Sequence, residues 1–168
     1  MEIRFLNKKD NIDAVCAVYE AGWKNAYRGI IPQEFLDNIK KEKWRAGIQN
    51  PELNSFIMLD GEKIIGTASY CASRFMSMKG FGEIVSLYLL PDYWDKGYGK
   101  RLLQAAVDGL GELGYTQVFL WVLEENVRAR AFYEKFGFRN SGDCLNDNIG
   151  GKDLRELRYI YKFKPQST

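Results

Sequence analysis

Apolar and polar residues alternate in residues 2–6 and 154–163, which predicts β-strands there. One stretch, residues 84–90, is instead apolar and aromatic without a break, which is typical of a strand buried on both faces. Pro91 ends it, because proline cannot donate a hydrogen bond to a neighbouring strand. The dipeptide Asp60-Gly61 predicts a tight hairpin turn. The predicted strands are residues 2–6, 56–59, 63–71, 84–90, 117–122, 154–163 and a strand that begins at residue 138.

Between the strands, other stretches place apolar residues three and four positions apart, as on one face of a helix. Asp10 or Asn11 is expected to cap the first helix, and Pro32 opens the second in the first-turn position that proline favours. Gly114 and Gly137 follow the third and fourth as helix-ending residues. The predicted helices are residues 12–23, 32–39 with an extension to 48, 102–113 and 126–136.

The order of these elements predicts an α+β fold with a mixed, mostly antiparallel sheet of about seven strands and about four flanking helices. The strand–helix–strand units that begin at Ile84 are expected to pair in parallel. With 168 residues, 46% of them hydrophobic, the chain is expected to form one domain, residues 1–168, with a full hydrophobic core.

The composition excludes several kinds of chemistry and partner. The chain has no histidine, so Ser-His and Cys-His nucleophiles are excluded and a metal site is not expected. Its three cysteines are far apart, which favours free thiols in a reducing cytoplasm. A net charge of +2 and the lack of a long apolar run point to neither nucleic acid nor membrane as a partner. Whether the chain forms a homodimer stays open.

Two glycines, Gly97 and Gly99, stand between the buried strand and the helix that follows it. Such a loop turns backbone N–H groups toward one point at the positive end of the helix dipole, where phosphate binds well. The loop is not a P-loop, because Arg101 stands where Ser or Thr is needed. It is not a Rossmann fingerprint, because Leu102 replaces the third glycine. A turn that uses glycine for tightness alone is the alternative.

A second motif lies one strand further along the chain. Read alone, it is an amphipathic helix that packs on the sheet and ends at a glycine. It reads Asn126-Val127-Arg128-Ala129-Arg130-Ala131-Phe132-Tyr133-Glu134-Lys135-Phe136-Gly137-Phe138.

Together the two motifs resemble the GNAT superfamily of N-acetyltransferases, of the bacterial small-substrate type. The glycine loop is similar to the family's acetyl-CoA pyrophosphate loop, Arg/Gln-x-x-Gly-x-Gly/Ala, and the second motif meets every fixed position of Asn-x-x-Ala-x-x-x-Tyr-x-x-x-Gly-Phe. Both stand in the family's order and spacing, within residues 83–138. The resemblance implies the GNAT fold and an acyltransferase that uses acetyl-CoA as co-substrate and needs no metal.

The loop departs from the family at Trp94, which stands at the Arg/Gln position beside the pyrophosphate. Trp cannot make the same bidentate contact. The backbone N–H groups do not depend on this side chain, and Lys96, Lys100 and Arg101 bring positive charge nearby. CoA binding is therefore expected to survive.

The resemblance also assigns residues to the cofactor. The backbone of the central strand would pair with the pantetheine and serve the thioester oxygen. Asn126 would contact the pantetheine, cap its helix, or do both. The residues assigned to acetyl-CoA are Leu87, Tyr88, Leu89, Asp95, Lys96, Gly97, Tyr98, Gly99, Lys100, Asn126 and Tyr133.

In the family, the amine attacks the thioester directly while both substrates are bound. Tyr133 matches the family's general acid for the departing thiolate, and a core tyrosine with a satisfied hydroxyl is the alternative. Glu83, at the start of the central strand, is the candidate base, directly or through water. A solvated glutamate at a strand end is the alternative for Glu83.

Trp23 and Tyr27 are expected to bind the acceptor, because the first two helices wall the acceptor pocket in this family. Packing in the core between these helices is the alternative for both. The leading hypothesis is acetylation of a primary amine of a small molecule. The competing hypotheses are acetylation of protein N-termini or lysines, and a catalytically silent acetyl-CoA sensor.

Overall fold

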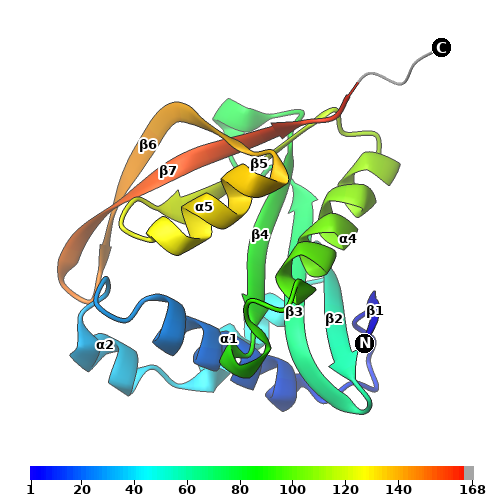
Figure 1. Ribbon diagram of the computed structural model, residues 1–168, viewed down its shortest axis with the longest axis vertical. Helices are drawn as coiled ribbons and strands as arrows, with labels where there is room; N and C mark the ends of the chain where they lie inside the picture. Colours follow the sequence, from blue (N-terminus) through cyan, green and yellow to red (C-terminus); the bar gives the residue numbers. More distant parts are fainter. Residues whose placement is uncertain (165–168) are drawn as a thin grey trace.

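The computed structural model describes residues 1–164, and a seven-stranded sheet forms its centre (Figure 1). The strands are β1 (Glu2–Phe5), β2 (Asn54–Asp60), β3 (Lys63–Ala72), β4 (Gly82–Leu89), β5 (Gln117–Leu123), β6 (Arg139–Ile149) and β7 (Lys152–Lys162). Their order across the sheet is β1-β2-β3-β4-β5-β7-β6. Only β4 and β5 pair in parallel among these strands. The predicted α+β class is therefore confirmed, and so is parallel pairing for the first strand–helix–strand unit, β4 to β5. For the second unit, β5 to β6, the prediction is wrong, because β7 lies between these strands and pairs antiparallel with both.

The helices are α1 (Ile12–Ala26), α2 (Gln33–Asn38), α3 (Arg45–Ile48), α4 (Tyr98–Glu112) and α5 (Val127–Phe136). The predicted second helix is wrong in its extension to residue 48. It ends at Asn38, because Ile39 and Lys40 are extended, with ψ of 130° and 138°. The extended link keeps both Leu36 and Ile39 buried against Leu123 of β5. Helix then resumes only as a short 3-10 turn and the single turn of α3.

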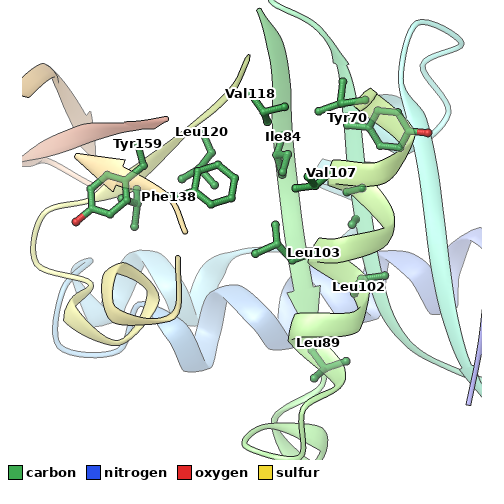
Figure 2. Packing of buried hydrophobic residues seen from close by; sticks show 14 of the residues in the cluster. Tyr70, Ile84, Leu89, Leu102, Leu103, Val107, Val118, Leu120, Phe138 and Tyr159 are labelled. Carbon is green, nitrogen blue, oxygen red and sulfur yellow. The ribbon is translucent and has the colours of Figure 1, made fainter. Parts of the chain in front are cut away.

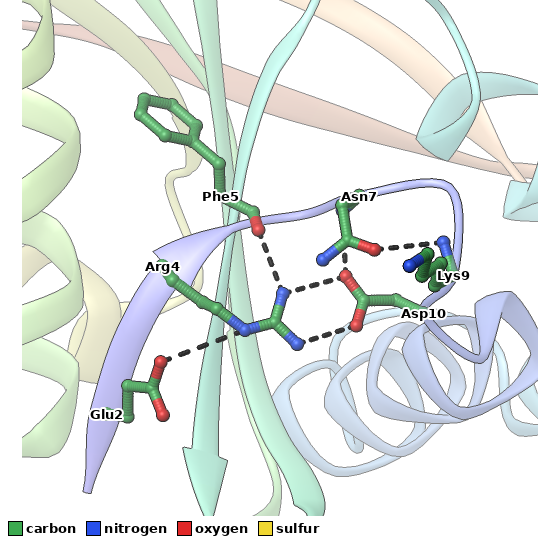
Figure 3. Close-up of polar contacts among 6 residues, drawn as sticks. All are labelled: Glu2, Arg4, Phe5, Asn7, Lys9 and Asp10. Carbon is green, nitrogen blue, oxygen red and sulfur yellow. Dashed lines mark hydrogen bonds and ion pairs between the residues drawn. The ribbon is translucent and has the colours of Figure 1, made fainter.

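Of the two residues proposed as the cap of α1, one caps the helix and the other forms an ion pair. Asn11 is the N-cap, and its side chain accepts a hydrogen bond from the backbone N–H of Ala14 at 3.2 Å. Asp10 instead binds Arg4 of β1 through both carboxylate oxygens, at 2.8 and 2.6 Å (Figure 3). The hydrogen bond from Arg4 holds the pKa of Asp10 below its usual value. This pair fixes the first strand to the first helix.

Helices cover both faces of the sheet. On one face, α4 packs its apolar stripe, including Leu102, Leu103 and Val107, on β3, β4 and β5 (Figure 2). On the other face, α1 places Val15 and Val18 against β2 and β3. None of the helices between residues 1 and 164 is long and apolar enough to span a bilayer.

The parallel pair of strands opens after two residues. β4 and β5 are in register only at Gly82 with Val118 and at Glu83 with Phe119. β4 then continues to Leu89 along β3, without a β5 partner on its other edge. The part of β4 that carries the predicted cofactor residues therefore has a free backbone edge.

Candidate active site

The glycine loop forms a group of free backbone donors at the start of α4. The amides of residues 95–100 donate to no backbone acceptor within the described part of the chain. Gly97 is the N-cap of this 15-residue helix, with φ of 81°. A Cβ atom at Gly97 would meet nothing within 4 Å, so the space above the amides is open. A tight turn by itself accounts for glycine at position 97, because the backbone there has a positive φ. The free amides at the N-terminus of α4 also form a site that suits an anion.

Arg128 of α5 lies at this loop, a contact that the sequence reading did not anticipate. Its guanidinium carbon is 4.1 Å from the centre of the Trp94 ring, and its Nη2 donates to Oδ1 of Asp95 at 2.9 Å. Two of the basic residues expected to serve the loop have other partners. Lys96 donates to the carbonyl of Asp92 at 2.7 Å, and Arg101 binds the carbonyl of residue 1 at 3.3 Å.

Four tyrosines have phenols close enough to influence one another's pKa, and we call them the tyrosine cluster: Tyr19 of α1, Tyr27 directly after α1, Tyr88 of β4 and Tyr133 of α5. Burial raises the pKa of each hydroxyl above its usual value of about 10. The phenol of Tyr27 lies close enough to raise the pKa of Tyr133 and of Tyr88 further. The predicted general acid and one predicted acceptor residue therefore meet at one place.

Tyr133 is a buried phenol that packs against two phenylalanines. Its ring packs against Phe132 and Phe138, with centroids 5.2 and 5.8 Å away. Its hydroxyl makes no hydrogen bond to any residue that the structure describes, so the alternative of a satisfied core tyrosine is not met. Because burial raises its pKa, the phenol keeps its proton at neutral pH. Its role as general acid stays a prediction.

Tyr19 anchors the cluster to the sheet. Its hydroxyl lies 2.7 Å from Oγ of Ser86, which lies 2.6 Å from Oγ of Ser69. The ring of Tyr19 lies 4.9 Å from that of Tyr88. These hydrogen bonds join α1 to β4 and β3. They also satisfy hydroxyl groups whose burial without a partner would be unfavourable.

Glu83 is not a solvated strand-end residue, because it is only 1% exposed. Its Oε1 accepts a hydrogen bond from Nη2 of Arg74 at 2.7 Å, and its Oε2 accepts from the Nε and the backbone N–H of Arg74 at 3.2 and 3.0 Å. Its partner in β3 is Cys71, whose pKa rises to about 11 through burial and the nearby carboxylate. Cys71 therefore stays protonated at neutral pH.

Glu83 and the tyrosine cluster lie at different points along β4. Glu83 and Tyr88 are five residues apart, which is about 16 Å along an extended strand. The amides of residues 95–100 follow the far end of the same strand. The predicted residues thus line β4 from end to end, and Glu83 reaches the cluster only through water or a bound molecule.

Trp23 and Tyr27 pack between the first helices, as one of the two roles weighed for them requires, and their acceptor role stays a prediction. Their rings touch edge to face, with centroids 4.9 Å apart. Both pack on the small core cluster that includes Leu36 and Leu123, yet neither is fully buried. The ammonium of Lys43 lies 5.0 Å from the Trp23 ring, so this ring already holds a cation of the protein.

Glu156 of β7 is a second residue that the sequence reading missed. It is opposite Leu123 in the sheet, and it is close enough to Tyr27 to raise the pKa of that phenol. Burial, and then the charge of Asp147, raise the pKa of Glu156 itself. No ion pair engages it among residues 1–164. The alternating pattern of β7 placed Glu156 on a strand, but only the sheet order shows what it faces.

Trp121 adds an unpaired donor on the same face of β5. Side chains alternate along a strand, so Trp121 points to the same side as Phe119 and Leu123. Its indole N–H is buried and has no acceptor in the part of the chain that the structure describes. Burying an N–H without an acceptor is unfavourable, so an acceptor placed at this N–H would stabilise the site.

The rest of the described chain offers no second constellation of this kind. A surface hollow between β1, the start of α1 and the β2–β3 turn lies apart from the tyrosine cluster, and its charged lining includes Arg4 and Asp10, which bind each other. Within residues 1–164, no three Cys, Asp or Glu side chains gather in the way that a metal ion requires.

Comparisons with known proteins show which family the sequence resembles. The sequence profile of the acetyltransferase (GNAT) family matches residues 16–138. The N-acetyltransferase YuaI of Bacillus subtilis is 26% identical over 152 residues, which are 89% of this chain and 87% of YuaI. The spermidine N(1)-acetyltransferase of Thermoplasma acidophilum is 28% identical over 163 residues, which are 95% of this chain and 98% of that protein.

A solved structure also matches nearly the whole chain. The PaiA N-acetyltransferase of Thermoplasma acidophilum, crystallised in complex with coenzyme A, superposes with a TM-score of 0.74 at 25% identity. The match covers 96% of this chain and 98% of that one.

Proposed function

Because the chain belongs to the GNAT acetyltransferase family, we propose that it acetylates a primary amine of a small molecule, by direct attack of the amine while both substrates are bound. It is an acyltransferase, and acetyl-CoA is its co-substrate. The observation that carries the choice of acceptor is Glu156, a half-buried carboxylate beside Tyr27 with no cationic partner among the residues described. A partly desolvated carboxylate favours a cation beside it, and an amine substrate supplies one.

The residues present fit acetyl-CoA. When bound, acetyl-CoA supplies a thioester carbonyl as the electrophile. The free amides of residues 95–100 hold its diphosphate at the N-terminus of α4. The edge of β4 that β5 leaves uncovered, at Leu87 to Leu89, offers backbone groups to the pantetheine amides, apart from the Leu89 carbonyl, which accepts the indole N–H of Trp94. Asn126 caps α5 through its Oδ1, which leaves its NH₂ group for the pantetheine.

Two groups move protons in this proposal. Tyr133, protonated and without a partner, donates its proton to the departing thiolate. Glu83 accepts the proton of the amine through water, since it is about 16 Å along the strand from Tyr88. Arg74 fixes the Glu83 carboxylate, and Oε1, which accepts only one of the three hydrogen bonds, keeps a lone pair that a water molecule can use.

The acceptor lies between α1 and the β5–β7 face in this proposal. Trp23 and Tyr27 offer aromatic surface to a cationic amine, and Glu156 offers a counter-charge. The relative from Thermoplasma acidophilum is named for spermidine, a small amine with several cationic groups. This name supports a cationic acceptor for the present chain.

A thiol-release assay with acetyl-CoA tests the function. The panel is a set of diamines and polyamines, amino acids, aminoglycosides and peptides with free N-termini, and mass spectrometry identifies the acetylated product. We expect turnover with at least one small cationic amine. Turnover with peptides alone would favour a protein acetyltransferase. Tight CoA binding without turnover on any amine would favour a sensor.

A further inference from the structure

Trp94 leaves the loop without the Arg or Gln side chain that lies beside the pyrophosphate in the GNAT family. A cationic side chain nevertheless lies there, since the guanidinium carbon of Arg128 is 4.1 Å from the centre of the Trp94 ring. We propose that Arg128 binds the diphosphate of CoA in this enzyme, carried on α5 and held over the loop by Trp94 and Asp95.

Two contacts hold the guanidinium in place, and a third fixes the ring on which it stacks. The indole N–H of Trp94 donates to the carbonyl of Leu89 at 2.8 Å, which fixes the ring at the end of β4. The ring then stacks with Arg128. Nη2 of Arg128 donates to Oδ1 of Asp95 at 2.9 Å, and Asp95 is the first residue with a free amide in the loop. The indole therefore does not replace the missing cation but supports one from another helix.

The geometry suits a diphosphate. The planar guanidinium donates two parallel hydrogen bonds to phosphate oxygens, as the family's loop arginine does. Arg128 is 53% exposed and Asp95 is 86% exposed, so a ligand can reach both. An exposed ion pair is weak, and a diphosphate carries more charge than one carboxylate. The diphosphate therefore displaces Asp95, while the stacking on Trp94 remains.

The other basic residues near the loop have different partners. Lys96 donates to a carbonyl and lies over the Tyr93 ring, and Arg101 reaches back to the first residue of the chain. Arg128 is bound instead to the two residues that precede and open the group of free amides. The inference rests on the placement of CoA proposed above, which the Gly97→Val variant described in the Discussion tests separately.

Calorimetry with CoA and with 3′-dephospho-CoA tests the inference, because it needs no acceptor. Arg128→Gln should raise the Kd of both ligands about tenfold to a hundredfold, as expected for the loss of a charged hydrogen-bonded contact. The variant should also reduce the salt dependence of binding. Arg45→Gln is the matched control, because it removes an arginine from another exposed pair, with Asp13. It should leave both Kd values unchanged.

A rescue experiment makes the inference specific. Adding Trp94→Arg to Arg128→Gln returns the family's residue to the loop, and we expect it to recover most of the lost affinity. Arg128→Lys keeps the positive charge but loses the paired N–H donors of the guanidinium, so it should give an intermediate Kd. Melting temperatures establish that each variant is folded.

Two results would overturn the proposal. A folded Arg128→Gln protein whose Kd for CoA stays within about twofold of the wild type would leave Arg128 with only a surface ion pair. A loss of affinity for CoA but not for dephospho-CoA would assign Arg128 to the 3′-phosphate instead of the diphosphate.

Discussion

Gly22 of α1 approaches Tyr88 of β4 so closely that a Cβ atom on Gly22 would lie 2.6 Å from Cδ1 of the ring. The Cγ and Cβ atoms of Tyr88 would lie only 3.1 and 3.2 Å away, so the ring cannot move aside by rotation alone. This contact sets the distance between the helix that carries Trp23 and the strand that carries Tyr88. Glycine is therefore needed here for close packing rather than for an unusual φ.

Gly22→Ala should lower the free energy of unfolding by about 1–3 kcal/mol, since the methyl group overpacks the contact between α1 and β4. It should also raise the KM for the acceptor, because Tyr88 and Tyr27 must shift. Gly47→Ala is the control, since a Cβ atom there meets nothing within 4 Å. Thermal melting of both variants decides, and equal melting temperatures would contradict the close contact.

Gly97→Val should abolish measurable CoA binding, because its side chain fills the space above the amides of residues 95–100. Valine at a φ of 81° also strains the backbone. Gly114→Val is the matched control, since Gly114 has a φ of 90° and open space at the other end of α4. Both variants should melt earlier, and calorimetry should show lost affinity only for Gly97→Val. Unchanged CoA affinity in folded Gly97→Val would place the diphosphate elsewhere.

Glu156→Gln should raise the KM for a cationic acceptor about tenfold or more while the Kd of CoA stays the same. The substitution removes the negative charge that lies near Tyr27. Glu62→Gln, in the exposed β2–β3 turn, is the control for lost charge. Equal effects of Glu156→Gln on both substrates would indicate damage to the fold instead of a lost acceptor contact.

The same substitution should also change how the stability of the folded protein depends on pH. Burial raises the pKa of folded Glu156 above that of the unfolded chain, so the folded state binds the proton more tightly. Wild-type stability therefore falls as pH rises from the unfolded pKa through the folded one. Glu156→Gln should melt higher than wild type at neutral pH, and the gap should close near pH 4. A gap that widens toward low pH would contradict the raised pKa.

The sequence predicted the strands and the longer helices because their signals are local. Pro91 and the apolar run before it fixed the end of the central strand, and Asn126 and Gly137 marked both ends of α5. The second helix was predicted too long, because apolar residues at helical spacing also suit an extended link that keeps Leu36 and Ile39 buried.

The site was predicted in part, for a related reason. Tyr133 and the glycine loop belong to motifs that are contiguous in the chain. Arg128 lies over Trp94 only because α5 folds back onto the loop, 33 residues away from Asp95 along the chain. Glu156 faces Tyr27 only because β7 lies next to β5 in the sheet. Contacts of this kind depend on the order of the strands, which the periodicity of one segment does not determine.

Tyr133→Phe removes the proposed proton donor while it keeps the ring that packs on Phe138. Tyr161→Phe is the matched control, since its ring packs on the same Phe138 at 5.4 Å. Both variants should fold and bind CoA as the wild type does. Because thiolate departure needs the proton, only Tyr133→Phe should lose turnover, and the loss should shrink at low pH, where solvent protonates the thiolate.

Steady-state kinetics of Tyr133→Phe, with the Kd of CoA and the melting temperature measured beside them, therefore test the catalytic account most directly. The account predicts a kcat lower by about 10²–10³-fold with CoA affinity preserved, which marks a contact made in the transition state. A kcat near that of the wild type would contradict it and would leave thiolate departure to water.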